Sequence, residues 1–383
     1  MIRLGIERVS EYREVFSGKK LGMITAPSGT DQKLHSSAEL FMQQYPLSAF
    51  YGPEHGIRGE ADAGDPVDGV MIDVRTGLPM YSLYRTDSKD FTADMLEGID
   101  ALVYDIQDLG LRFYTYISTM VKALEACTAY GKELIILDRP NPLGGQCIDG
   151  GRLHNDYESF VGCYDIPIRY GLTIGELAMM VHSEQKMNCK LTVIPMTGWT
   201  RDLLFPDLGY PFLMPSPSIP NFHNAMLYAG TCLLEGTNIS EGRGTSDPFA
   251  ILGAPFIDAF DLCDALHSLR IPGVLITPTF FTPSASKHAG SPCQGVHLHL
   301  TSPSAYPAVS TGVQIIDTLR TLYPKDFSYA SSLEVNHKHM LDLLSGSDAL
   351  RTNLSTEPLL EEWKKDSLDF EERSSSYHLY GWR

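Results

Sequence analysis

Four short apolar runs in the first 140 residues each end in a cluster of polar residues. The runs are KLGMITA (20–26), LSAFY (47–51), ALVYDI (101–106) and ELIILD (133–138). Short, continuous apolar runs separated by helix-like segments are typical of strands that are buried on both faces of a parallel sheet. We therefore predict an α/β fold with a mostly parallel sheet for the first part of the chain.

Segments with helical spacing of apolar residues lie between these runs. They cover residues 35–45, 112–131 and 173–185, and Gly131 is a suitable stop for the second of them. KLTVIPM (190–196) continues the alternation as a further strand. Residues 52–90 are rich in Gly, Asp and Pro, and MIDVRTGLPMYSLY within them predicts a small hairpin.

A proline-rich segment interrupts this pattern. FPDLGYPFLMPSPSIP (205–220) contains five prolines, too many for a helix or a central strand. We place the domain boundary there, with a catalytic domain at 1–215 and a smaller α/β domain at 216–383 that closes a cleft. In the second domain we expect strands at 273–280 and 294–300, helices at 305–323, 335–344 and 356–365, and an ordinary chain end.

Composition excludes several functional classes. With 47 acidic and 30 basic side chains the formal charge is −17, which argues against nucleic acid and anionic membranes as partners. No apolar run reaches 18 residues and the N-terminus lacks a signal-peptide pattern, so we expect a cytoplasmic protein unless a leader has been removed. Seven widely spaced cysteines without a C-x-x-C pair suit buried thiols in a reducing compartment.

The usual cofactor and nucleophile motifs are absent from the sequence. It has no G-x-G-x-x-G after the first strand, no P-loop and no G-x-S-x-G elbow. His297 and His299 share one face of a predicted strand, but two imidazoles without a third ligand do not predict a zinc site. We therefore expect no metal and no cofactor, and no feature of the sequence predicts an oligomeric state.

Polar residues follow the predicted strands at the point where ligands bind to open parallel sheets, outside the carboxyl ends of the strands. This edge collects Glu54, His55, Arg58, Asp105, Asp108, Arg112, Asp138, Arg139 and Asn141. A solvated turn explains a single Glu-His pair as well as a catalytic role does, but the convergence of several clusters favours an active site.

The first cluster, GPEHGIRG, places Glu54 beside His55 among three glycines that allow close approach of a ligand. A carboxylic acid protonates a leaving group well when burial raises its pKa, so Glu54 is a candidate general acid. Arg58, like Arg112 further along, is suited to grip a carboxylate or phosphate, or to neutralise a neighbouring aspartate.

The next two clusters are YDIQDLGLRFYTY and DRPNP. Asp105 is expected inside the sheet as a base or ligand, and Asp108 is the better candidate for a helix cap. Tyr114 and Tyr116 are suited to stack on a ligand. In the third cluster, Asp138 either lines the site with Arg139 and Asn141 or locks the turn by accepting backbone hydrogen bonds.

A last polar segment, LLEGTNISEGRGTSDPF (233–249), follows the domain boundary. Glu235 and Glu241 flank Asn238, and Arg243 stands between two glycines. A long glycine-rich segment of this kind is either a mobile surface loop or the second wall of a cleft that faces the first domain.

Taken together, GPEHGIRG with ADAG, TGLPMYSLY, DIQDLGLRFYTY, DRPNPLGG and EGTNISEGRGT resemble, in order and spacing, the exo-β-N-acetylmuramidase NamZ family over essentially the whole chain. The resemblance implies a Rossmann-like N-terminal domain, a smaller C-terminal domain and an active site between them. It also implies release of N-acetylmuramic acid from the non-reducing ends of peptidoglycan fragments. The chain departs from the family in lacking an export signal and in carrying Asp247 where relatives commonly have a neutral residue.

On this resemblance we assign Glu54 as general acid, with Asp105 or Glu241 as the second carboxylate. An arginine in the pocket would bind the lactyl carboxylate of the sugar. Retention of configuration needs carboxyls about 5 Å apart and inversion about 6.5–9.5 Å, and an acetamido group also permits substrate-assisted catalysis. Two rival functions are a sugar- or peptide-binding protein without chemistry, and a hydrolase of the peptide or ester portion of wall fragments.

Overall fold

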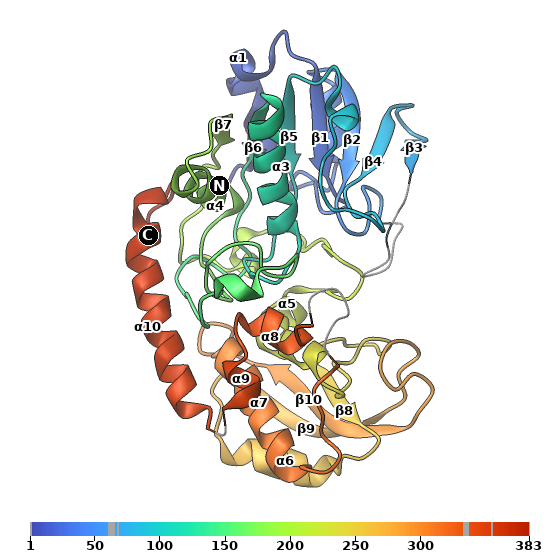
Figure 1. Cartoon of the computed structure of the whole chain (residues 1–383), viewed down its shortest axis with the longest axis vertical. Helices are drawn as coiled ribbons and strands as arrows, with labels where there is room; N and C mark the ends of the chain where they lie inside the picture. The colour runs from blue at the N-terminus through green and yellow to red at the C-terminus, as the bar shows by residue number, and fades with distance from the viewer. Residues whose placement is uncertain (1, 60–65, 67–68, 332–336, 354, 383) are drawn as a thin grey trace.

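The computed structural model describes residues 2–59, 66, 69–331, 337–353 and 355–382 (Figure 1). Its N-terminal sheet has the strand order β3-β4-β2-β1-β5-β6-β7, and each neighbouring pair is parallel except β3 with β4. The strands are β1 (Leu21–Thr25), β2 (Leu47–Gly52), β3 (Val70–Ile72), β4 (Pro79–Ser82), β5 (Ala101–Asp105), β6 (Glu133–Leu137) and β7 (Lys190–Ile194). The predicted mostly parallel sheet is confirmed.

Burial explains why the apolar runs form the centre of this sheet. Every residue of β1 and β5 is buried, as expected for strands covered on both faces. The helices of this part are α1 (Arg13–Phe16), α2 (Ser37–Met42), α3 (Tyr116–Tyr130) and α4 (Ile174–Glu184), with short 3₁₀ turns at Gly5–Glu11, Asp94–Leu96, Asn155–Tyr157 and Phe205–Leu208. Helix α3 ends at Gly131 in the left-handed conformation, as predicted.

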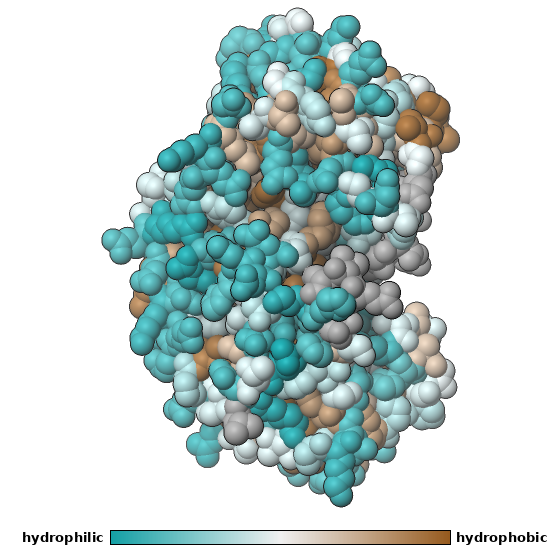
Figure 2. Space-filling model, in the orientation of Figure 1, coloured by the Kyte–Doolittle hydropathy of each residue, from teal (hydrophilic) through white to brown (hydrophobic). Residues whose placement is uncertain are grey.

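The predicted hairpin is also confirmed, and it forms one edge of the sheet. Strands β3 and β4 pair antiparallel, while β4 continues the parallel sheet next to β2. Val70, Ile72 and Val74 of this hairpin are exposed, and they account for the apolar patch at the upper right of Figure 2. Asp73 holds the hairpin turn by accepting hydrogen bonds from the Thr76 amide and hydroxyl.

The C-terminal part contains a second, antiparallel sheet of order β8-β10-β9. Its strands are β8 (Ile251–Ala254), β9 (Val274–Phe281) and β10 (Cys293–Leu300), and its helices are α5 (Phe222–Thr231), α6 (Ala259–Ser268), α7 (Ala308–Leu322), α8 (Met340–Ser345) and α9 (Ala349–Thr352), with a 3₁₀ turn at Cys232–Gly236. The predicted smaller α/β unit is confirmed. Strand β8 and helix α6 were not predicted. The four residues of β8 are too few to show a period, whereas α6, with ten residues, was overlooked.

The last helix returns to the N-terminal sheet. Helix α10 (Glu357–Ser374) runs along one side of the molecule from the lower to the upper part (Figure 1) and leads through a 3₁₀ turn (Ser375–Tyr377) to the chain end. Arg373 pairs with Glu184 of α4, and the Tyr380 hydroxyl donates to Asp138 at 2.5 Å. The chain end is therefore a packed part of the N-terminal unit, and the domain limits 1–215 and 216–383 stay a prediction.

Within the described residues, no helix combines the length and the apolar character that crossing a bilayer requires. The seven cysteines are all free thiols, five of them buried. Burial raises the pKa of several of these thiols, such as Cys163, whose pKa rises to about 11. These thiols are therefore poor nucleophiles at neutral pH.

Candidate active site

A cavity of about 760 Å³ lies where the two parts of the molecule meet. Glu54, Tyr114 and Thr115 line it from the N-terminal part, at the carboxyl ends of the strands. Tyr228, Glu235 and Glu241 line it from the C-terminal part. The cavity is therefore the one place among the described residues where the predicted catalytic clusters of both parts meet.

Glu54 is held at the end of β2. Its side chain is buried, and its Oε2 accepts a hydrogen bond of 2.7 Å from the hydroxyl of Thr115, the residue just before α3. His55 follows with φ +75° and Gly56 with φ +74°. A left-handed conformation costs a residue other than glycine about 1 kcal/mol or more, so surrounding contacts must fix this sharp turn, which places Glu54 at the cavity.

Glu241 lies in a strongly charged environment. Lys287 Nζ lies 3.0 Å from its Oε2, and Arg243 Nε lies 3.4 Å from its Oε1. Lys287 is fixed in turn by donating to the carbonyl oxygens of Leu234 (2.7 Å) and Ile239 (3.0 Å). Two cations therefore hold this buried carboxyl in place at the cavity wall.

Glu235 is the third carboxyl of the cavity. Its Oε1 accepts from Arg243 Nη2 at 2.9 Å, while another guanidinium nitrogen of Arg243 donates to Ser218 Oγ at 2.7 Å. Burial raises the pKa of Glu235, and the neighbouring Glu241 adds to this, against the opposing charge of Arg243. Glu235 thus keeps a proton more readily than an ordinary glutamate does.

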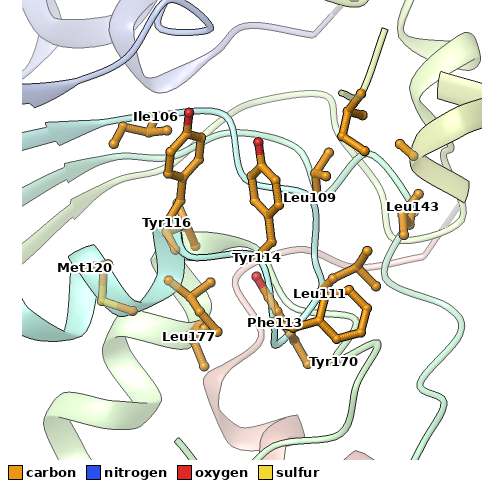
Figure 3. Close-up of a cluster of buried hydrophobic side chains, with 14 of the residues drawn as sticks. Ile106, Leu109, Leu111, Phe113, Tyr114, Tyr116, Met120, Leu143, Tyr170 and Leu177 are labelled. Carbon is orange, nitrogen blue, oxygen red and sulfur yellow. The ribbon is translucent and has the colours of Figure 1, made fainter. Parts of the chain in front are cut away.

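Aromatic rings form the apolar part of the wall. Tyr228 packs edge-on against Phe249 at 4.6 Å between centroids and against Phe113 at 5.3 Å. Figure 3 shows Tyr114 and Tyr116 next to each other within a buried cluster, and the centroids of their rings are 4.9 Å apart. Rings of this kind present flat apolar faces that suit the C–H surface of a sugar.

Five of the predicted site residues line the cavity, namely Glu54, His55, Tyr114, Glu241 and Arg243. The others lie outside its lining and have structural partners. Asp105 forms a fully buried ion pair with Arg139, with Nε–Oδ1 at 2.5 Å and Nη2–Oδ2 at 2.8 Å. This pair links β5 to the end of β6.

Asp108 and Arg112 are buried next to the cavity wall. Asp108 accepts from the Gly110 amide at 2.7 Å and from the Tyr170 hydroxyl, and burial raises its pKa to about 6. The capping interpretation of Asp108 is wrong, because α3 begins only at Tyr116. Arg112 donates to three carbonyl oxygens, those of Gly151, Ile166 and Leu344, and so ties α8 to the N-terminal part.

The remaining predicted residues also hold loops in place. Asp138 accepts from the amides of its neighbour Arg139 and of Gly175, as the turn-locking interpretation expected. Arg58 donates to the Asp73 carboxylate, and the Tyr116 hydroxyl donates to the Pro215 carbonyl oxygen. Asn141 donates to the Leu172 carbonyl oxygen, and Asn238 donates to the Asp326 carbonyl oxygen.

The sequence interpretation missed several residues of the cavity. Polar ones include Thr115, Ser218 and Lys287, and Tyr228 and Phe249 are the rings that pack against each other. Lys287 lies in the loop between β9 and β10, and no local pattern links it to Glu241. Tyr228 lies on an apolar helix, where a core role is the ordinary expectation.

Carboxyls, cations and aromatic rings that meet in the cleft of a two-part α/β protein define the class of glycoside hydrolases. The chain belongs to the exo-β-N-acetylmuramidase NamZ family, because the N-terminal model of that family matches residues 21–223 and the C-terminal model matches residues 226–380. It is 42% identical over 386 aligned positions to the peptidoglycan β-N-acetylmuramidase NamZ of Bacillus subtilis (strain 168), covering 99% of this chain and 91% of the relative.

Two solved structures of DUF1343-family proteins from Bacteroides fragilis NCTC 9343 share the fold. One has a TM-score of 0.89 at 37% identity and covers 99% of each chain. The other has a TM-score of 0.76 at 28% identity and covers 100% of each chain. The similarity therefore extends over both parts of the molecule, including the sides that enclose the cavity.

Proposed function

We propose that this protein is an exo-acting glycoside hydrolase that releases N-acetylmuramic acid from the non-reducing ends of peptidoglycan fragments. Its similarity to the Bacillus subtilis enzyme supports the substrate class. The observation that carries the proposal is that carboxyls from both parts of the molecule line one cavity: Glu54 accepts a hydrogen bond from the Thr115 hydroxyl at 2.7 Å, and Glu241 lies within 3.4 Å of Lys287 and Arg243.

In the proposed mechanism Glu54 acts as general acid. Its proton passes to the glycosidic oxygen, and the bond from that oxygen to C1 breaks with the electron pair staying on the oxygen. Glu241 stabilises the positive charge that develops at C1, and water then adds to C1 while its proton passes to the carboxylate of Glu54, which is thereby returned to its acid form. The contact between Thr115 and Glu54 orients the acid.

Substrate recognition follows from the rest of the lining. The lactyl group of N-acetylmuramic acid carries a carboxylate, and Arg243 and Lys287 are the cations next to Glu241 that could bind it. Tyr228 and Phe249 offer apolar faces to the sugar ring. In this proposal Asp105 has a structural role and does not contact the substrate, because its carboxylate forms an ion pair with Arg139.

The test is mass spectrometry of products from a MurNAc–GlcNAc disaccharide. We expect free N-acetylmuramic acid from the wild type and a loss of about 10³-fold in rate for Glu54→Gln and for Glu241→Gln. Glu362→Gln, an exposed glutamate on α10, is the matched control and should keep the wild-type rate.

Each rival function gives a different result in the same experiment. A non-catalytic binding protein would bind the disaccharide and leave it intact, with or without Glu54. A hydrolase of the peptide or ester portion would leave the disaccharide intact but release an amino acid or acyl group from a muropeptide. Either outcome would exclude the glycosidase proposal for this substrate.

A further inference from the structure

A second cavity of about 540 Å³ opens beside the catalytic one. It is lined by residues 85–90, which follow β4, by one face of α3 and by residues 158–163. Lys89 and Phe160 line both cavities. A chain that leaves the catalytic cavity past these two side chains therefore enters the second one.

The boundary between the two cavities is aromatic. The rings of Tyr84 and Phe160 lie 5.6 Å apart, and Lys89 Nζ lies 3.5 Å from the centre of the Tyr84 ring. Aromatic faces combined with hydrogen-bond donors are suited to a sugar, which has an apolar C–H face and polar edges. The boundary can thus bind a sugar residue that follows the cleaved bond.

Charged groups of both signs line the second cavity. The side chain of Arg85 is nearly buried, with an exposure of 11%, and that of Lys122 is 34% exposed. Lys122 Nζ pairs with Asp90 at 2.9 Å and with Glu125 at 3.1 Å, and Asp87 and Glu158 are the other carboxylates of the lining. The carboxylates can accept hydrogen bonds from the hydroxyl and amide groups of a sugar, and the cations can donate to its oxygens.

We propose that the second cavity binds the leaving part of the glycan beyond the first sugar after the cleaved bond. This inference rests on the proposed function. In an alternating glycan, the next sugar in that direction is again an N-acetylmuramic acid, and its hydroxyl and acetamido groups would meet the charged groups around Lys122. A disaccharide fills only the catalytic cavity, whereas a tetrasaccharide reaches both, so the enzyme prefers longer chains.

The test compares kcat/KM for the MurNAc–GlcNAc disaccharide and for the tetrasaccharide made of two such units. We expect the wild type to cleave the tetrasaccharide about tenfold more efficiently. Lys122→Ala should lower the tetrasaccharide value about fivefold, mainly through KM, and leave the disaccharide value within about twofold. Lys325→Ala, an exposed lysine elsewhere, is the matched control.

A second variant fills the cavity without removing a charge. Thr86 is exposed and lines only the second cavity, so Thr86→Trp should reduce tetrasaccharide cleavage selectively. Equal efficiency of the wild type on both substrates would overturn the inference while leaving the proposed function intact. Equal losses on both substrates in Lys122→Ala and Thr86→Trp would also overturn it. Failure to cleave either substrate would remove the proposed function and the inference together.

Discussion

The hydroxyl of Thr115 donates a 2.7 Å hydrogen bond to Glu54 Oε2 and so joins the segment before α3 to the turn after β2. The two residues are 61 positions apart in the chain. They meet because β2 and β5 both adjoin β1, so their carboxyl ends lie at one edge of the sheet. The contact orients the proposed general acid toward the cavity.

Thr115→Val should lower kcat about tenfold, because the loss of a hydrogen bond to a carboxyl leaves the acid less well oriented. KM should change little, since Thr115 is assigned no contact with the substrate. Steady-state kinetics on the disaccharide measures both values. Thr115→Ser keeps the hydroxyl and should restore the rate; a valine variant as active as the serine variant would contradict this role.

Lys287→Met should lower kcat about 100-fold, because it removes the cation that holds the Glu241 carboxyl in place at a distance of 3.0 Å. Lys287→Arg keeps the charge and should recover part of the loss. Lys325→Met is the control for removal of a lysine at an exposed site. Unchanged kcat in Lys287→Met would contradict a positioning role of this lysine for Glu241.

Asp105→Asn should destabilise the fold by about 3–5 kcal/mol, because it leaves the buried guanidinium of Arg139 without a counter-charge. The rate per folded molecule should stay near that of the wild type. Denaturant unfolding and active-site titration measure the two quantities. Asp105→Leu combined with Arg139→Met removes both charges and should recover much of the stability. A stable Asp105→Asn protein without activity would instead place Asp105 in the chemistry.

The ion pair between Glu184 and Arg373 should make docking of α10 depend on pH. Burial raises the pKa of Glu184, but hydrogen bonds from Arg373 and Tyr164 outweigh this and lower it below its ordinary value of 4.5. The ionised form therefore stabilises the fold above pH 4.5, and this contribution is lost as pH falls through the lowered pKa.

Arg373→Met should accordingly cost about 1 kcal/mol at neutral pH, a small value because both side chains are partly exposed. The difference in thermal stability from the wild type should shrink as the pH falls below 4.5. Arg13→Met, at an exposed position on α1, is the control. A difference that stays constant from neutral to acid pH would show that Glu184 does not titrate with the fold.

The architecture of the N-terminal sheet could be predicted from local sequence. LGMIT and ALVYD are apolar throughout because they form β1 and β5 at the centre of the sheet, and every one of their residues is buried. Four-residue β8 and the full length of α10 could not be predicted in this way. Strand β8 is too short to show a period, and α10 packs against a surface formed by residues that are distant in the sequence.

The candidate site was only partly predictable for a related reason. A polar residue after a strand is visible in the sequence, but whether it faces the cavity or a buried partner depends on contacts between distant segments. Asp105 and Glu54 both follow this pattern, yet the first is paired with Arg139 and the second lines the cavity. A buried charged group requires a counter-charge or hydrogen-bond partners, and a local pattern does not contain them.

The sequence alone therefore determined the order of strands and helices, the carboxyl edge as the site and the family resemblance, because these follow from short-range periodicity and motifs. Only the tertiary structure decided which polar residues meet. It brought Lys287 to Glu241 from the loop between β9 and β10, and it packed Tyr380 onto Asp138. Ion pairs and hydrogen bonds act over a few ångströms in space, so chain folding, not sequence separation, sets them.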